Sequence, residues 1–402
     1  MGALRAIILG AGYRGRAYAA YAKAHPDELE IVGVADPHQA GSIAAPRTWL
    51  DWRECLSARP EAELAILTLP DAQHHEAALR ALEGGYHLLL EKPLATTAEG
   101  CREVVVAGLR ARRLVMVGHV LRHVARYAYI KALIESGELG EVVSISHQES
   151  VGFAKMSHSF VRGELADSAE SSPMILTKCS HDFDLFVWWI GRRCRKVASF
   201  GSTRLFSREN APTGAGARCT ACPAAIESSC VWSARRLYSG GELGYLFADA
   251  SAEAMERVVE ESRYGRCVYR CENDAPDHQG VLLEFEGGAT VSHMMTGFSM
   301  RNVRTTRIGL TRGEIVCEGD RLEVLPFDGA ATGVRVPRVC EPNLSRHGGG
   351  DFNLMADAIR LVRRGDAREW ARQTESALAS HLIAFAAEES RRRGGEVLEV
   401  EI

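Results

Sequence analysis

The sequence predicts an α/β protein with two domains. Residues 1–120 are expected to form a doubly wound parallel sheet, and residues 121–402 an α+β domain with a mostly antiparallel, open-faced sheet. At 402 residues the chain is too long for one ordinary core. Its first part alternates apolar runs with amphipathic helical segments. From residue 141 onward, apolar and polar residues alternate, as in strands with one buried face.

The first part contains five short apolar runs, which are typical of strands buried on both faces of a parallel sheet. These strands are expected at residues 5–9, 30–35, 64–69, 87–90 and 114–117. The helices between them are expected at residues 14–24, 73–84 and 97–112. A further helix, 124–136, leads into the second part.

In the second part, strands are expected at residues 141–149, 196–203, 280–285, 289–295, 305–309 and 313–318. Helices are expected at residues 180–190, 351–364 and 371–391. Residues 206–244, rich in Gly, Arg and Cys, are predicted to be an inserted loop.

Composition excludes several classes of protein. With 46% hydrophobic and 25% charged residues, the chain is ordinary for a globular protein. Its net charge of -4 gives no reason to expect nucleic acid or a membrane surface as a partner. No apolar run is long enough to cross a bilayer, and the first residues lead directly into a strand, so we expect a cytoplasmic protein. The 11 cysteines are an odd number, and we expect most of them to be reduced.

A glycine motif follows the first predicted strand and opens a helix. Gly10 permits a tight turn, Gly12 lets the backbone approach a pyrophosphate, and Gly15 allows close packing of helix on strand. Asp36 ends the second strand, where a carboxylate binds the hydroxyls of the adenosine ribose. The two residues after Asp36 offer no arginine for a 2′-phosphate, so NAD is favoured over NADP. The alternative is a structural glycine turn.

The fourth strand ends in Glu91, Lys92 and Pro93. Doubly wound sheets bind ligands at this edge, so the Lys92 ammonium is a candidate catalytic and substrate-binding group that stabilises negative charge on a reacting oxygen. Glu91 is expected to pair with a positive group or a cofactor hydroxyl. A cis bond before Pro93 is compatible with its small energetic penalty. The alternative is a salt bridge at the end of a strand.

The third strand leads into Leu69 and Pro70, which are expected to line the nicotinamide side of the cofactor site. His74 then begins a helix and is a candidate cofactor neighbour. A solvated or helix-capping histidine remains the alternative for His74 and for His75.

His181 is the candidate acid/base, because a histidine suits reversible proton transfer near neutral pH. It is expected to begin a helix, with Asp182 and Asp184 in the first turn. Asp184 could orient the imidazole or contact substrate or cofactor. Lys178 is a second candidate catalytic and substrate-binding cation, which would favour a substrate carrying a carboxylate. A buried core role for His181 and a structural ion pair for Lys178 remain alternatives.

Further candidates are weaker. His347 precedes a glycine run and could reach the substrate, although a helix-capping loop explains it equally well. Tyr127, the loop Glu149–Phe160 with His158, and the segment 273–278 are candidate pocket walls, with a solvated loop as the favoured alternative for each.

A cysteine cluster falls within the insertion. Cys219, Cys222 and Cys230 have part of the spacing of a metal site, and Cys267 or Cys271 could complete it. The predicted set is Cys219, Cys222, Cys230 and Cys271 around a structural zinc ion, with reduced thiols as the alternative.

These motifs together resemble the Gfo/Idh/MocA family of oxidoreductases. The resemblance continues through Val117–His119, Arg122, residues 139–142, Lys178–Asp184 and His347–Asp351, and thus covers nearly the whole chain. It implies a Rossmann domain whose cofactor-binding residues are Gly10, Gly12, Tyr13, Arg14, Gly15, Asp36, Leu69, Pro70, His74, Glu91, Lys92 and Arg122. It also implies a substrate pocket shaped by the open sheet, and a homo-oligomer, dimer or tetramer, formed through that sheet.

Thr177 and Cys179 stand where most relatives carry aspartate and glycine. This departure puts the usual substrate in doubt. The expected function is an NAD(P)-dependent oxidoreductase acting on a hydroxyl of a sugar, polyol or sugar acid. The alternatives are a redox-neutral NAD-dependent glycoside hydrolase and a non-catalytic sensor.

Overall fold

The first sheet has six parallel strands in the order β3-β2-β1-β4-β5-β6. The structure is a computed structural model that describes residues 2–239, 243, 251–329, 332–334 and 349–401. The strands are β1 (Leu4–Leu9), β2 (Leu29–Ala35), β3 (Thr48–Trp49), β4 (Leu64–Leu67), β5 (His87–Leu90) and β6 (Val115–Val117). The order reverses at β1, which places the switch point and its ligand crevice beyond the ends of β1 and β4.

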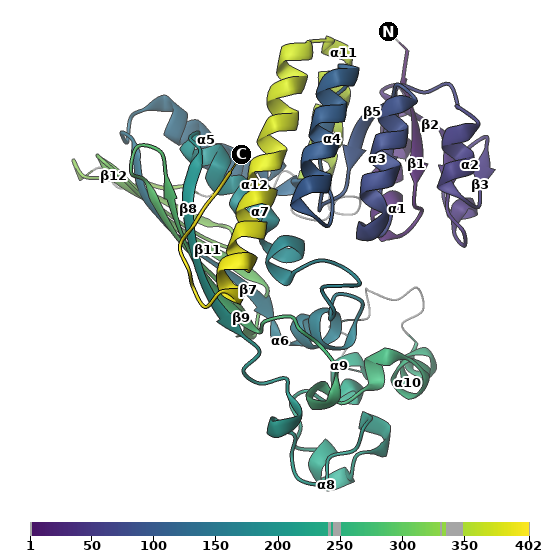
Figure 1. The fold of residues 1–402 in the computed structure, drawn as a ribbon, viewed down its shortest axis with the longest axis vertical. Coiled ribbons are helices and arrows are strands. Elements are labelled where there is room, and N and C mark those ends of the chain that lie inside the picture. The colour runs from purple at the N-terminus through teal and green to yellow at the C-terminus, as the bar shows by residue number, and fades with distance from the viewer. Residues whose placement is uncertain (1, 240–242, 244–250, 330–331, 335–348, 402) are drawn as a thin grey trace.

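Four helices accompany this sheet (Figure 1): α1 (Tyr13–Ala24), α2 (Trp52–Ser57), α3 (His74–Glu83) and α4 (Ala98–Ala111). The predicted strands and helices of this part are confirmed to within two residues at each end. The unpredicted elements β3 and α2 follow the second strand. Periodicity could not reveal them, because β3 has two residues and α2 six.

The second sheet has nine strands in the order β14-β13-β12-β11-β7-β10-β9-β8-β15. All neighbours are antiparallel except β7 and β10, which run parallel, so the predicted mostly antiparallel sheet is confirmed. The strands are β7 (Val142–Gly152), β8 (Cys194–Ser202), β9 (His278–Phe285), β10 (Thr290–Ser299), β11 (Val303–Leu310), β12 (Gly313–Glu318), β13 (Arg321–Pro326), β14 (Thr332–Val334) and β15 (Leu398–Glu399).

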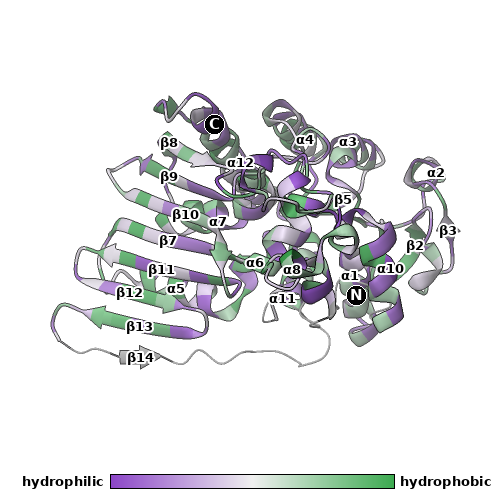
Figure 2. Ribbon diagram, turned by 90° about the horizontal axis from the view of Figure 1, so that it is seen from below, coloured by the Kyte–Doolittle hydropathy of each residue, from purple (hydrophilic) through white to green (hydrophobic). Residues whose placement is uncertain are grey.

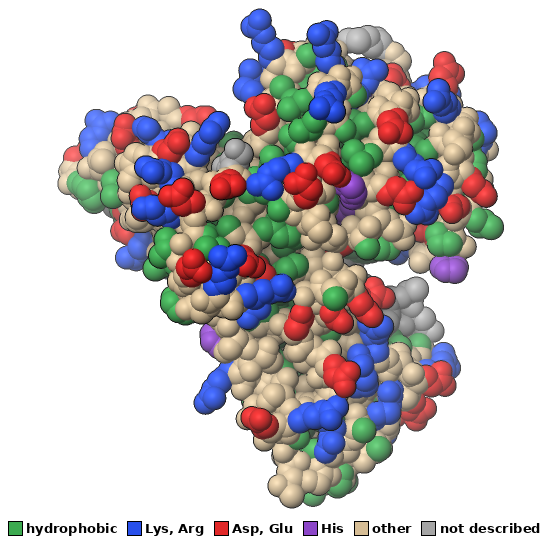
Figure 3. All heavy atoms as spheres, in the orientation of Figure 1, with side chains coloured by type: hydrophobic (Ala, Val, Ile, Leu, Met, Phe, Trp, Pro, Cys, Tyr) green, Lys and Arg blue, Asp and Glu red, His purple; other side chains and the backbone are tan. Residues whose placement is uncertain are grey.

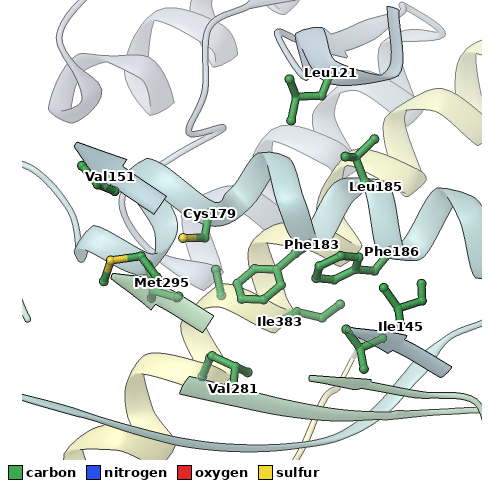
Figure 4. Packing of buried hydrophobic residues seen from close by; sticks show 14 of the residues in the cluster. Leu121, Ile145, Val151, Cys179, Phe183, Leu185, Phe186, Val281, Met295 and Ile383 are labelled. Atoms are coloured by element: carbon green, nitrogen blue, oxygen red, sulfur yellow. The ribbon is translucent and has the colours of Figure 1, made fainter. Parts of the chain in front are cut away.

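One face of this sheet is covered by α5 (Ala125–Ser136), α7 (Met174–Ile190) and part of α12 (Ala367–Arg392). Phe183 and Phe186 of α7 and Ile383 of α12 point toward apolar side chains of the strands (Figure 4). Helix α7 begins six residues earlier than predicted, because Met174, Ile175 and Leu176 continue its buried apolar face.

The other face of the sheet is open and carries exposed apolar side chains. Phe200 is 64% exposed, Leu282 61% and Met294 43%. Green and purple residues alternate along the strands in Figure 2, as expected for a sheet covered on one side.

The last two helices return to the first sheet. Helix α11 (Gly350–Arg364) packs beside α1, and α12 contacts α4 and β6 as well as α7 and β8 (Figure 1). Leu354, Met355 and Ile359 belong to a core shared with β1 and β2. The predicted division at residue 120 therefore describes the two sheets, but not these helices.

The insertion extends away from both sheets (Figure 1). It contains short helices rather than only a loop: α8 (Ala224–Glu227), α9 (Ala234–Ser239) and α10 (Ala252–Glu261). Helix α6 (Phe153–Lys155) and a π-helical segment (Met156–Arg162) connect it to β7. A small cluster built around Leu237, Tyr238 and Met255 forms its apolar core.

Basic and acidic side chains are intermixed over the face of the molecule seen in Figure 3. No helix among the described residues combines the length and hydropathy needed to traverse a bilayer.

Candidate active site

The glycine loop between β1 and α1 is closely packed at two of its three glycines. Gly10 has φ +100°, and a Cβ there would lie 2.5 Å from the carbonyl oxygen of Thr68. A Cβ on Gly15 would lie 2.1 Å from the carbonyl oxygen of Gly10. Around Gly12, by contrast, no atom lies within 4 Å of a Cβ position. The loop thus leaves space at the one position where a pyrophosphate approaches the backbone, so these residues fit a dinucleotide.

Asp36 lies at the end of β2 and fixes the same loop. Its Oδ2 accepts a hydrogen bond from the backbone N–H of Ala11 at 2.8 Å. Its Oδ1 accepts from the N–H groups of His38 at 2.9 Å and Gln39 at 2.7 Å. Partial burial acts to raise the pKa of Asp36, but these hydrogen bonds outweigh it and lower the pKa. The ionised carboxylate keeps acceptor capacity for ribose hydroxyls.

Glu91 has the positive partner that the sequence predicts for it. Arg14 Nε donates to Glu91 Oε1 at 2.6 Å, and the hydroxyl of Tyr18 donates to the same oxygen at 2.5 Å. Arg14 Nη2 donates to Asp351 Oδ1 at 2.8 Å, so Arg14 joins α1, β5 and α11. Burial opposes the ionisation of Glu91, but Arg14 outweighs it and the pKa is lowered. Tyr13, at the start of α1, is 43% exposed.

His74 is fully buried and holds two loops of the crevice together. Its Nε2 lies 2.8 Å from the carbonyl oxygen of Leu69, and its Nδ1 lies 2.6 Å from that of Pro93. Both ring nitrogens thus face backbone carbonyl groups, and Pro70 is exposed at the rim. The Lys92–Pro93 peptide bond is cis. His74 therefore positions the chain next to Lys92 and is neither solvated nor a helix cap.

Lys92 reaches from the first sheet to helix α7. Its Nζ donates a hydrogen bond to the carbonyl oxygen of Thr177 at 2.7 Å. Burial is the main cause that lowers the pKa of Lys92; Lys178 adds to the effect, whereas Asp71 opposes it. A lysine with a lowered pKa can exchange a proton near neutral pH more readily than an exposed one.

His181 lies one helical turn after Thr177, so the Lys92 ammonium and the imidazole meet along the same stretch of α7. The ring of His181 is 6.0 Å from that of His119, between centroids. His181 lies in the third turn of the helix and does not begin it, as the sequence had led us to expect. The predicted effect of the helix dipole on Asp182 and Asp184 is therefore wrong.

Asp184 binds Arg122 and His119, which lie just after β6, rather than His181. Arg122 donates to both of its carboxylate oxygens, Nε to Oδ2 and Nη2 to Oδ1, each at 2.6 Å. Nδ1 of His119 lies 2.9 Å from Oδ1. Burial acts to raise the pKa of Asp184, but Arg122 and His119 outweigh it and lower the pKa. Arg122, a predicted cofactor ligand, is thus occupied in a buried ion pair.

Asp182 points to the second sheet, because residues two apart on an α-helix lie on opposite sides. Nε of Arg304 donates to its Oδ1 at 2.6 Å. Nε2 of His147 and Nε2 of His293 lie 3.4 and 3.5 Å from its two oxygens. Among the described residues, this is the one group of three candidate metal ligands within 4.8 Å of one another. Arg304 already balances the carboxylate, so we assign the cluster the role of anchoring α7.

Lys178 forms an ion pair with Glu149, and Lys155 lies in the same electrostatic environment. Lys178 Nζ lies 2.5 Å from Glu149 Oε1, and Arg304 Nε lies 2.8 Å from Glu149 Oε2. Lys155 of α6 has no ion pair among the described residues. Burial, together with the nearby charges of Lys178 and Lys92, lowers the pKa of Lys155 to about 8. The sequence analysis predicts Lys155 only as part of the weak candidate loop Glu149–Phe160.

Three other candidates lie away from this cluster or outside the described residues. Tyr127 is 1% exposed in the core of the second domain, against Trp189, where a bound substrate could not touch it. His158 is buried in the insertion against Tyr238 and Tyr264. His347 lies outside the described residues.

Two family models match the chain. An oxidoreductase family with an NAD-binding Rossmann fold matches residues 4–119, and the GFO/IDH/MocA C-terminal domain matches residues 127–316. The chain belongs to the GFO/IDH/MocA family. The predicted resemblance is therefore confirmed.

Several curated relatives of this GFO/IDH/MocA protein are inositol 2-dehydrogenases. The one from Pseudomonas fluorescens Pf-5 is 33% identical over 142 residues, which are 33% of this chain and 42% of the relative. The chain thus matches less than half the length of that relative. A Bacillus subtilis protein named YteT is 22% identical over 312 residues, 73% of this chain and 71% of its own.

Solved structures share the whole fold with this family member. Apo levoglucosan dehydrogenase has a TM-score of 0.74 at 19% identity and covers 100% of both chains. The same enzyme in complex with NADH has a TM-score of 0.73 at 17% identity and covers 99% of both chains. At this identity the likeness concerns the fold.

Proposed function

We propose that this protein catalyses NAD-dependent oxidation of a secondary hydroxyl group in a sugar, polyol or sugar acid. The observation that carries the proposal is the hydrogen bond from Lys92 Nζ to the carbonyl oxygen of Thr177, one turn before His181. It brings a cation and a proton acceptor together at the carboxyl edge of the first sheet, where doubly wound folds bind their ligands.

NAD, when bound, accepts the hydride. The free space at Gly12 and the ionised carboxylate of Asp36 support this cofactor. Lys92 hydrogen-bonds the substrate hydroxyl oxygen and stabilises the negative charge that develops on it. His181 takes the hydroxyl proton. Glu91 holds Arg14 beneath the crevice, and His74 positions the loop that carries Lys92.

The cations around Lys92 favour a substrate that carries a carboxylate. Lys178 was the sequence candidate for this role, but Glu149 neutralises it. Lys155 is the better candidate, because it shares the electrostatic environment of Lys92 and Lys178 and has no ion pair among the described residues. A substrate carboxylate would supply the missing negative charge.

A second function is redox-neutral: transient oxidation of a ring carbon acidifies its neighbour, a leaving group is eliminated, water adds to the double bond so formed, and the carbonyl is reduced again with the hydride removed in the first step. A relative from Escherichia coli K12, 2,7-anhydro-N-acetylneuraminate hydratase, supports this alternative with 28% identity over 139 residues, 34% of this chain and 37% of its own. Lys92 and His181 would serve it equally, since it begins with the same oxidation.

We propose further that the open face of the second sheet joins copies of this chain into a homo-oligomer. Phe200, Leu282 and Met294 together leave an apolar area in water, which association would bury.

The deciding experiment incubates the protein with NAD or NADP and a panel of polyols, aldoses, uronates and aryl glycosides. Net oxidation predicts NADH accumulating in a 1:1 ratio with oxidised product. The redox-neutral alternative predicts release of the aryl group while NADH stays constant. Tight cofactor binding without turnover of any substrate would contradict both.

A further inference from the structure

Four cysteines from three separate segments line one cavity of the insertion. The cavity is small, and Cys219, Cys222, Cys230 and Cys267 all contribute to its wall. Cys219 lies at the start of a short helical turn, Cys230 follows α8, and Cys267 precedes another short turn. Folding has therefore brought together four thiols that are up to 48 residues apart in the sequence.

Two arginines line this cavity, and one of them is fully buried. Arg162 is fully buried and lines the cavity. It donates to the carbonyl oxygens of Arg266 at 2.7 Å and Trp232 at 2.6 Å, while its Nη1 has no hydrogen-bond partner. Arg218 lines the same cavity and donates to two further carbonyl oxygens.

In the part of the chain that the structure describes, neither Arg162 nor Arg218 has a carboxylate within salt-bridge distance. Glu227 also lines the cavity, but its Oε1 accepts from Ser233, and no ion pair joins it to either arginine. Burying a guanidinium group without a compensating negative charge is costly, so a negative charge beside Arg162 would stabilise the fold.

We propose that Cys219, Cys222, Cys230 and Cys267 bind a structural zinc ion as four thiolates. Four thiolates around Zn²⁺ carry two net negative charges, which would compensate the buried guanidinium group of Arg162 and act favourably on Arg218.

The surroundings of Cys219 already suit a thiolate. The backbone N–H of Ala234 donates to its sulfur at 3.3 Å, and Arg162 Nη2 lies 3.9 Å from the same sulfur. Such donors stabilise metal-bound sulfur.

The fourth ligand differs from the one chosen from the sequence. Cys271 does not line the cavity; its thiol donates to the carbonyl oxygen of Cys267 at 3.3 Å. Cys267 takes its place. No three of the four cavity sulfurs lie within 4.8 Å of one another. Binding therefore requires the thiols to rotate inward, toward Zn–S distances of about 2.3 Å, with loss of their protons.

The zinc site would hold separate segments of the insertion together. Arg162 ends the segment that begins at α6, and α6 carries Lys155. The zinc ion would link the three cysteine-bearing segments and compensate Arg162, and would thereby fix the insertion against the segment that presents Lys155. This site stands independently of the proposed oxidoreductase activity.

The test is the metal content of the purified full chain, measured by plasma mass spectrometry. We expect about one zinc ion per chain in the wild type and in Cys271→Ser, and a loss of most of the zinc in Cys222→Ser and Cys230→Ser. Cys271→Ser is the matched control, because Cys271 lies beside the cavity without lining it. Wild-type protein without zinc, full zinc in Cys222→Ser, or a loss of zinc in Cys271→Ser would overturn the proposal.

A second measurement uses the wild-type protein, so it does not depend on whether the cysteine variants fold. Wild-type protein is prepared with Co²⁺ in place of Zn²⁺. Intense thiolate-to-cobalt charge-transfer bands together with tetrahedral d–d bands are expected. A spectrum of octahedral cobalt, or disulfide bonds between the four cysteines in the native protein, would refute a tetrathiolate site.

Discussion

The ammonium group of Lys92 donates to the carbonyl oxygen of Thr177 at 2.7 Å, and this hydrogen bond links the end of a parallel strand to a helix of the other domain. The bond places Lys92 beside the turn that contains His181. Replacing Lys92 is therefore expected to impair the chemical step and to leave cofactor binding unchanged.

We expect Lys92→Met to lower kcat by about a hundred- to ten-thousandfold, because the charge that stabilises the reacting oxygen is lost. NADH fluorescence titration should give a nearly unchanged Kd, since the nucleotide is held by the glycine loop and Asp36. Turnover close to that of the wild type would remove Lys92 from the mechanism.

The glycine loop offers a matched pair of substitutions. Gly15→Ala should destabilise the fold by about 1–3 kcal/mol, because the new methyl group would overlap the carbonyl oxygen of Gly10. Gly12→Ala should keep the melting temperature but weaken NAD binding at least about tenfold, because its methyl group would enter the cofactor space. Thermal unfolding and NADH titration distinguish the two. Unchanged NAD affinity in Gly12→Ala would contradict the assignment of the crevice.

Lys155 gives a prediction that depends on pH. Its pKa of about 8 means that its positive charge is present at pH 7 and is lost as the pH rises through 8. The KM for a sugar acid should therefore rise between pH 7 and pH 9 more than the KM for a neutral polyol. Lys155→Met should raise the KM for the acid about tenfold or more at pH 7 and abolish this difference. An equal effect on acidic and neutral substrates would assign Lys155 a structural role only.

Asp184→Asn should cost about 3–5 kcal/mol in the free energy of unfolding, because it leaves the partly buried guanidinium of Arg122 without its counter-charge. The folded-state pKa of Asp184 is lowered, so its contribution is complete above the unfolded pKa of about 4 and is lost as the pH falls. The difference between wild type and variant should shrink below about pH 4 in urea titrations.

A matched control is Asp320→Asn. Asp320 lies 3.3 Å from Arg126 in a half-exposed pair, so this change should cost about 1 kcal/mol or less. Equal costs for the two variants would show that burial of the Asp184 pair does not matter.

Leu282→Glu should shift the protein toward the monomer in light scattering, because it places a charge in the apolar open face of the second sheet. Leu50→Glu is the control: Leu50 is 71% exposed but lies next to α2, at the far edge of the other sheet. If both variants keep the mass of the wild type, the sheet is not the interface.

Much of the fold could be predicted from periodicity, because the strands of the first sheet are continuous apolar runs and those of the second alternate. The helix that carries His181 shows the limit. The predicted helix begins at residue 180, whereas the buried residues Met174–Leu176 continue its apolar pattern back to the N-cap, Pro173.

The candidate site was predicted where one strand or turn determines a residue's place, as at Gly10, Asp36 and Lys92. Pairings between residues that are far apart in the chain could not be predicted, because they depend on tertiary contacts. The Lys178–Glu149 and Arg122–Asp184 ion pairs are examples: each removes from the pocket a cation that sequence had assigned to it. Lys155 was missed for the same reason, since only folding reveals that Glu149 pairs with Lys178 and not with Lys155.

Helix α12 packs against both domains of the molecule. The hydroxyl of Thr374 accepts from the N–H of Val115, Nε2 of His381 accepts from the N–H of Leu94, and Ile383 packs in the core beneath the other sheet. A rigid-body opening of the two domains would break the contacts of α12 with one of them. A nucleotide would therefore enter and leave through local movement of the loops that rim the crevice, and loop substitutions should alter its binding and release rates without lowering the melting temperature.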